Sequence, residues 1–181
     1  MTDKKSLFRF QIFSFIITAI LGVLLHFAYD FLGQNPIVGI FSSINESTWE
    51  HLKLIFFSML LSTIFGYFYF NKKYPNYLCI RAISIIISML FTVVFFYTYT
   101  GILGRNIAFI DISSFFISII IGEYITNKLI NYNLNCNKKI AIGILIFLFI
   151  LFGIYTFLPP NIGLFEDPLT GTYGINYDSL E

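Results

Sequence analysis

Five apolar runs, each about 20 residues or longer, constrain this chain more than any other feature of its sequence. A helix of about 20 residues crosses the roughly 30 Å hydrocarbon core of a bilayer. The charged fraction of 12% is about half of the ~25% typical of soluble domains, which also indicates lipid as the surrounding solvent. We therefore predict an all-α integral membrane bundle of five transmembrane helices, with spans at about 7–31, 46–70, 77–103, 107–128 and 139–158.

The basic residues predict the orientation of the bundle. Nine of the 11 lysines and arginines fall on the side that holds the N-terminus, and only Lys53 and Arg105 fall on the other. Because cytoplasmic loops carry the excess of Lys and Arg, we expect the N-terminus inside and the C-terminus outside. Cys79 and Cys136 lie on the inner side without a CxxC spacing, so we expect reduced thiols and neither a disulfide nor a structural zinc site. A net charge of +1 gives no reason to expect a nucleic acid partner.

Small and polar residues recur at steps of three or four along four of the runs, so that each run carries one stripe of them. Such residues mark helix–helix contacts in membranes, and we predict that the stripes face one another. A role in helix packing alone is the simplest interpretation of the Ser and Gly positions. Four ionisable residues stand near the outer ends of the stripes. The stripes are Gln11, Ser14, Thr18, Gly22, His26 and Tyr29; Ser47, His51, Ser58, Ser62 and Gly66; Ser84, Ser88, Thr92 and Tyr99; and Asp111, Ser114, Ser118, Gly122 and Thr126.

The start of the second run, "NESTWEHLK", holds an unusual number of charges for an apolar helix. At 100° per residue Glu46, Glu50 and Lys53 share one face, while His51 belongs to the stripe. A purely structural interpretation is open for the first group, because Ser43 with Glu46 and Ser47 with Glu50 both match a capping box. A Glu50–Lys53 pair three residues apart is equally open.

For the residues that face the bundle interior we predict a polar site near the outer boundary, since ionisable groups inside a membrane are functional candidates by default. The site is built from His26, Asp30, Glu50, His51 and Asp111. The metal candidates are His26, His51, Glu50 and Asp111, because imidazole and carboxylate suit zinc or a similar divalent ion. Glu50 and His51 are the catalytic candidates. Further expected members of the site are Asn45, Glu46, Lys53, Tyr99, Arg105, Glu166 and Asp167.

The chain divides into the transmembrane domain, 1–160, and an external tail, 161–181. Turn formers around Asp167 and Gly171 favour an ordered segment, and we expect residues 161–176 to fold back over the outer mouth of the bundle. A solvated acidic tail is the alternative.

Three functions fit these features. The leading hypothesis is a membrane-embedded enzyme or binder at the outer leaflet, in which a metal-activated water acts on a lipid or lipid-linked substrate. The first alternative is a transporter of a proton, a cation or a small solute along the hydroxyl-lined stripes. The second is a scaffold that binds a partner. Glu123, near the inner end of the fourth run, is expected to reach the interface or to pair with a loop lysine.

The segments "NESTWEHLK" (45–53) and "DPLTGTYGI" (167–175) together resemble an uncharacterised family of short bacterial multipass membrane proteins. Its members share N-E-S-x-W-E-H-x-K and D-P-x-T-G-T-Y-G-I segments, and the resemblance covers most of the chain. It implies a shared fold, with both segments important. We expect the bacterial cytoplasmic membrane as the location. The resemblance implies no activity, cofactor or oligomeric state.

Overall fold

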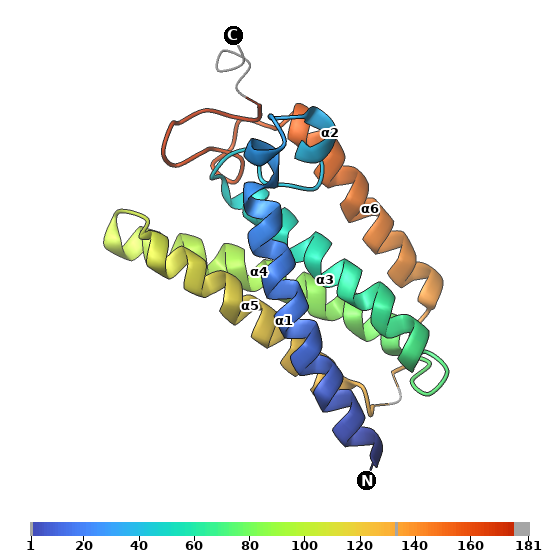
Figure 1. The fold of residues 1–181 in the computed structure, drawn as a ribbon. Coiled ribbons are helices and arrows are strands. Elements are labelled where there is room, and N and C mark those ends of the chain that lie inside the picture. The colour runs from blue at the N-terminus through green and yellow to red at the C-terminus, as the bar shows by residue number, and fades with distance from the viewer. Residues whose placement is uncertain (1, 133, 176–181) are drawn as a thin grey trace.

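A computed structural model describes residues 2–132 and 134–175, and within them the chain is all-helical except for an isolated bridge between Glu166 and Tyr173 (Figure 1). Five helices are long and apolar enough to cross a membrane, which confirms the predicted fold class and the five spans. Apart from the start of the first, their bounds lie within two residues of those expected. The helices are α1 (Thr2–Phe31), α2 (Pro36–Gly39), α3 (Thr48–Phe70), α4 (Tyr77–Leu103), α5 (Ala108–Leu129) and α6 (Lys138–Phe157).

Helix α3 forms the centre of the bundle. It packs against α1 and α4, the hairpin of α4 and α5 lies across α1 and α3, and α6 packs on the outside against α4 (Figure 1). The turn between α4 and α5 stands well away from α1 in Figure 1. The α4–α5 pair therefore diverges from the α1–α3 pair toward that turn. We call the end of the bundle that holds the tail, residues 161–175, the tail end.

The helix boundaries follow from local chemistry. Ser47 has an extended backbone and its Oγ accepts a hydrogen bond from the Glu50 amide at 3.3 Å, so α3 begins at Thr48 and leaves Glu46 in the preceding loop. Helix α4 ends at Gly104, whose φ of +69° is a left-handed cap that glycine adopts without strain.

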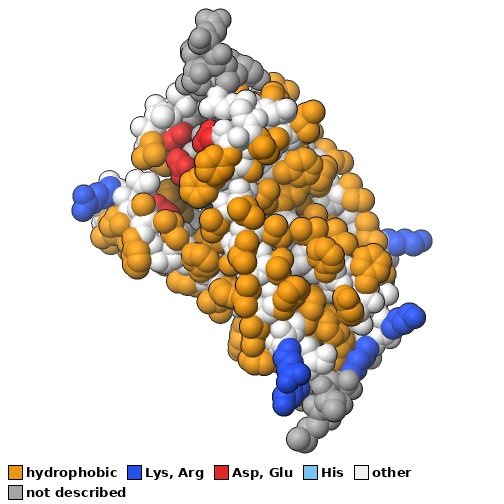
Figure 2. Space-filling view, viewed as in Figure 1, with side chains coloured by type: hydrophobic (Ala, Val, Ile, Leu, Met, Phe, Trp, Pro, Cys, Tyr) orange, Lys and Arg blue, Asp and Glu red, His pale blue; other side chains and the backbone are white. Residues whose placement is uncertain are grey.

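The predicted stripes are the surfaces that pack together. Their hydroxyl residues are buried, while large apolar side chains point outward from the same helices. Figure 2 shows these hydrophobic side chains over most of one face, with acidic side chains gathered at the tail end. A helix that is apolar on its outer side and polar on its inner side suits lipid surroundings.

Two long-range pairs differ from the sequence predictions. Glu123 binds Arg81 inside the bundle at 2.8 Å instead of reaching a loop lysine. Cys79 and Cys136 form a disulfide, with their Cα atoms 6.4 Å apart, so the expectation of free thiols is wrong. The segment before α6 folds back onto the first turn of α4, and the 57-residue separation of the cysteines gives no local signal of that contact.

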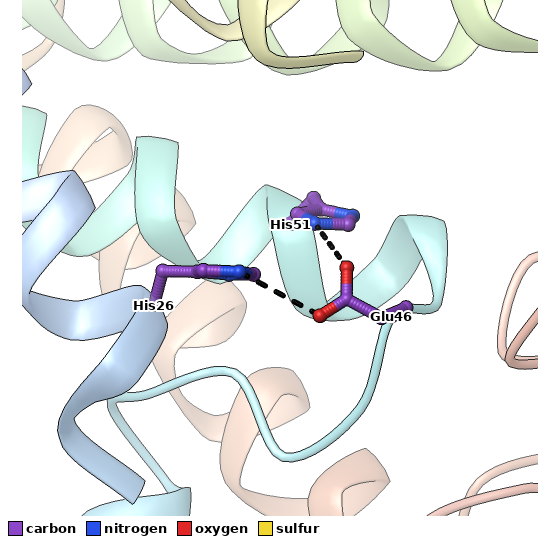
Figure 3. A group of neighbouring side chains, drawn as sticks. All are labelled: His26, Glu46 and His51. Carbon is purple, nitrogen blue, oxygen red and sulfur yellow. Dashed lines mark ion pairs between the residues drawn. The ribbon is translucent and has the colours of Figure 1, made fainter. Parts of the chain in front are cut away.

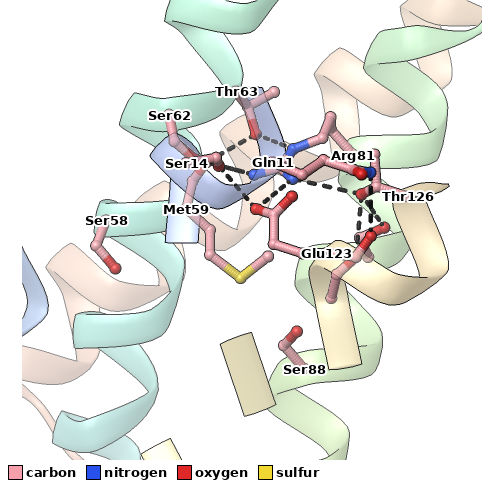
Figure 4. Close-up of polar contacts among 12 residues, drawn as sticks. Gln11, Ser14, Ser58, Met59, Ser62, Thr63, Arg81, Ser88, Glu123 and Thr126 are labelled. Carbon is pink, nitrogen blue, oxygen red and sulfur yellow. Dashed lines mark hydrogen bonds and ion pairs between the residues drawn. The ribbon is translucent and has the colours of Figure 1, made fainter. Parts of the chain in front are cut away.

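The ion pair between Arg81 and Glu123 is the centre of a buried polar network (Figure 4), in which Glu123 Oε2 has no hydrogen-bond partner among the described residues. Arg81 is fully buried, and its guanidinium also donates to Thr63 and Ser62, each at 2.9 Å. Ser14 of α1 donates to the same Glu123 oxygen at 2.7 Å. The network ties four helices together at a point remote from the tail.

Candidate metal centre

The loop between α2 and α3 carries Glu46 and is held in place at several points. At its start, the amide of Tyr29 in α1 donates to Ser42 Oγ at 2.9 Å. At its end, Asn45 Oδ1 accepts from the Ser47 amide at 3.0 Å, and the Glu46 amide donates to Asp167 Oδ2 of the tail at 3.3 Å. The Glu46 backbone is therefore fixed by the loop and the tail together.

Glu46 extends between two imidazoles that come from different helices (Figure 3). Its Oε1 lies 3.6 Å from His26 Nε2 of α1, and its Oε2 lies 3.4 Å from His51 Nε2 of α3. The two imidazole rings are stacked, with centroids 5.6 Å apart and an interplanar angle of 18°. One donor atom from each residue falls within 4.8 Å of the others, so a small inward movement would let all three bind one divalent ion. We call His26, Glu46 and His51 the triad.

The triad has unused bonding capacity. Its side chains are 27% (His26), 41% (Glu46) and 32% (His51) exposed, and His26 Nδ1 is buried without a hydrogen-bond partner among the described residues. The hydrogen bond with His51 holds the pKa of Glu46 below its ordinary value against the opposing effect of burial, and both imidazoles add to that lowering. Glu46 is therefore held as a carboxylate, the form that binds a metal.

The triad faces a cavity of about 450 Å³, which lies between the diverging helix pairs. Most of its wall is apolar, with aromatic side chains such as Phe27, Phe96 and Phe115. Asp111 of α5 also lines it, and Leu169 of the tail stands at its edge. An apolar pocket with a few convergent polar groups is the usual form of a small-molecule site.

Glu50, expected as a metal ligand and as the acid or base, is placed elsewhere. It is buried and forms an ion pair with Lys53, which is itself fully buried. The Lys53 ammonium also donates to Gly39 O at 2.7 Å and Thr156 Oγ1 at 3.0 Å, and Glu50 Oε2 accepts from the Ile44 amide at 3.0 Å. Both charges are satisfied within the protein, and neither residue lines the cavity.

The other predicted site residues divide into three groups. Tyr99 donates a hydrogen bond to Asp111, so it supports the cavity wall. Asp167 is buried and, with Asn45, holds the tail against the loop of Glu46. The remaining residues are exposed and lie outside the cavity wall: Asp30, which accepts from Gln34 at 3.4 Å; Arg105; and Glu166, which accepts from Tyr173 at 2.9 Å.

Sequence reasoning placed Glu46 in the wider polar site and gave the ligand role to Glu50. The signal in the sequence that bears on the choice between Glu46 and Glu50 was the presence of two possible capping boxes. Once Ser47 is the cap, Glu46 precedes the helix and can turn toward His26, whereas Glu50 is fixed on the helix face that meets Lys53.

A family model described as "Family of unknown function (DUF6512)" matches residues 2–175. No curated protein and no solved structure matches the chain.

Proposed function

The chain belongs to this family of unknown function, and we propose that it is a membrane-embedded, metal-dependent enzyme. The observation that carries the proposal is the triad of His26, Glu46 and His51, with donor atoms within 4.8 Å of one another beside an apolar cavity.

The ligand set supports a catalytic metal over a structural one. Two imidazoles and one carboxylate form a known catalytic zinc set, in which a fourth position is left for water or substrate. Structural zinc sites are closed by four protein ligands, and the described residues offer three here. The partly exposed side chains of the triad and the adjoining cavity leave room for that fourth ligand.

A divalent metal held by the triad would supply a water molecule with a pKa lowered to about 7. In the hydrolysis of an ester, the oxygen of this water bonds to the acyl or phosphoryl centre, and the alcohol leaves with the proton. The apolar wall favours a lipid-like substrate. The basic residues of the loops favour the outer leaflet as the place of action, and the resemblance described above implies a bacterial membrane.

Elemental analysis of the purified protein tests the proposal. We expect about one zinc or similar divalent ion per chain, lost in His26→Ala, Glu46→Ala and His51→Ala. Glu166→Gln, an exposed carboxylate outside the cavity at the same end, is the matched control and should retain the ion. Wild-type protein that takes up no stoichiometric divalent ion after incubation with zinc, cobalt or manganese would refute a metal-dependent enzyme.

Transport of a proton or cation and a scaffold role stay alternative hypotheses. A protein without metal whose cation or proton flux in liposomes is abolished by Asp111→Asn would favour transport. A protein with neither metal nor flux would leave the scaffold.

A further inference from the structure

The cavity wall carries one more ionisable side chain, Asp111, which comes from another helix and does not belong to the triad. His26 and His51 lie on the α1 and α3 side and Glu46 on the loop before α3, whereas Asp111 belongs to the first turn of α5. A ligand that reaches across the cavity therefore meets the triad at one end and Asp111 at the other.

Asp111 is held in a defined orientation. The Tyr99 hydroxyl donates to Asp111 Oδ1, and the Ile107 amide donates to the Tyr99 oxygen at 3.2 Å. No described residue donates to Asp111 Oδ2 through a side-chain hydrogen bond, so this oxygen is available to a ligand. A fixed carboxylate beside apolar walls favours a cationic donor, because charge-assisted hydrogen bonds are about twice as strong as neutral ones.

The charges at the two ends have opposite signs. A divalent ion bound by two neutral imidazoles and the Glu46 carboxylate leaves a net charge of about +1, whereas Asp111 contributes a negative charge. A ligand matched to both ends carries an anionic oxygen for the metal and a hydrogen-bonding cation for Asp111.

Building on the proposed metal centre, we propose that the cavity binds the headgroup of a zwitterionic aminophospholipid of the phosphatidylethanolamine type. The phosphate meets the metal at the triad, and the primary ammonium donates to Asp111. Phosphatidylcholine has no N–H to donate to this carboxylate, and phosphatidylglycerol has no cation, so Asp111 selects against both.

The size and position of the cavity fit a lipid that enters from the side. A volume of about 450 Å³ lies within the ~300–1,000 Å³ range of small-molecule sites and suits a phosphoethanolamine head with its glycerol. The acyl chains then need a way out of the cavity. Val23 of α1 and Ile112 of α5 line the cavity and are 45% and 59% exposed, so the wall between α1 and α5 borders the lipid-facing surface where the chains can leave.

The test uses full-length protein with zinc, reconstituted in nanodiscs that contain phosphatidylcholine, phosphatidylethanolamine and phosphatidylglycerol in equal amounts. Native mass spectrometry after release into detergent measures the retained lipids, and elemental analysis of the same samples measures zinc. We expect the wild type to retain phosphatidylethanolamine over phosphatidylcholine by roughly tenfold, since a hydrogen bond to a charged group contributes about that factor or more. Asp111→Asn should lose the preference and keep its zinc, and Asp30→Asn, the matched control, should keep both.

The outcomes separate this inference from the metal proposal. An Asp111→Asn protein that retains both zinc and the lipid preference overturns the headgroup assignment and leaves the metal centre intact. A wild type that holds zinc without selecting the aminophospholipid overturns it as well. A wild type without zinc refutes the metal enzyme. If such a protein still retains the aminophospholipid and the retention depends on Asp111, the result supports the contact between the ammonium and Asp111 alone. Soluble phosphoethanolamine that competes as well as the lipid overturns the membrane source of the ligand.

Discussion

Glu46 and Glu50 stand four residues apart in one segment, yet Glu46 is 41% exposed between two imidazoles and Glu50 is buried against Lys53. Glu50 and Lys53 bind each other, backbone groups and Thr156. The triad around Glu46 leaves donor atoms facing a cavity. The Glu50–Lys53 pair is satisfied within the protein, whereas the triad has donor atoms that the proposed metal would use.

The difference separates two reasons for placing ionisable residues in a membrane. A satisfied buried pair fixes the position of one element against another, here α3 against α2 and α6. An unsatisfied ionisable group at the edge of a cavity costs stability, and in a membrane protein it is a candidate for a binding role.

The largest expected effect comes from breaking the satisfied pair. Lys53→Met leaves the Glu50 carboxylate buried and uncompensated, and removal of one partner of a buried pair costs about 3–5 kcal/mol. We expect a large fall in the free energy of unfolding, measured by denaturant titration in detergent. The double variant Glu50→Gln with Lys53→Met should recover most of it. A single variant as stable as the wild type would show that this pair does not hold α3.

Glu123→Ala should have the next largest effect, about 3 kcal/mol. It leaves Arg81 buried without its carboxylate, although Thr63 and Ser62 still accept from the guanidinium. The same titration measures the loss, and zinc stoichiometry should be unchanged because this network is remote from the triad. Loss of zinc in a folded Glu123→Ala protein would contradict the separation of the two regions.

Zinc itself should stabilise the wild type by about 2.7 kcal/mol when present at a hundred times its dissociation constant. His51→Ala removes a ligand and should abolish this gain, while its metal-free stability should stay close to that of the wild type, as for partly exposed positions. Thermal unfolding with and without zinc distinguishes the two effects. A His51→Ala protein that zinc stabilises as strongly as the wild type would exclude His51 as a ligand.

Asp167→Ala tests whether the tail positions Glu46. Asp167 accepts a hydrogen bond from the Glu46 amide and is not itself a proposed ligand. Its loss should therefore lower zinc affinity by about tenfold, as for residues that orient ligands, while one ion per chain still binds. Zinc titration by calorimetry measures the loss. Glu166→Ala, the exposed neighbour, is the control, and equal effects of the two changes would refute a specific positioning role.

The smallest effect is the contribution of Glu46 to the stability of metal-free protein. Its pKa is lowered in the folded state, so the contribution is present above the ordinary carboxyl pKa and is lost as the pH falls through the lowered value. Partial exposure keeps it below about 1 kcal/mol. The difference in melting temperature between wild type and Glu46→Gln, measured with a chelator, should shrink as the pH falls below 4.5, the ordinary value of the carboxyl pKa. A difference that grows below that pH would contradict the lowered pKa.

The sequence predicted the parts of the fold that depend on composition and periodicity. Hydropathy located the five spans, and three- and four-residue spacing identified the buried stripes, including those that bring His26, His51 and Asp111 to one cavity. Orientation across the membrane, the headgroup site and the metal stay predictions.

The rest depended on tertiary contacts that no local pattern contains. The choice between Glu46 and Glu50 turned on which of two capping boxes forms. Arg81 was counted among the cytoplasmic charges because its partner, Glu123, lies 42 residues away. The disulfide between Cys79 and Cys136 also requires the path of the segment before α6.

The tail contacts have a consequence for biogenesis. Leu164 O accepts from the Trp49 amide at 2.9 Å, and Asp167 accepts from the Glu46 amide, so residues translated after all five spans complete the contacts at the start of α3 and in the loop before it. A nascent bundle that has already inserted into the membrane still lacks these contacts. The order of synthesis therefore delays completion of these contacts until residue 167 has been made, and a product truncated before it would insert without the tail contact that positions Glu46.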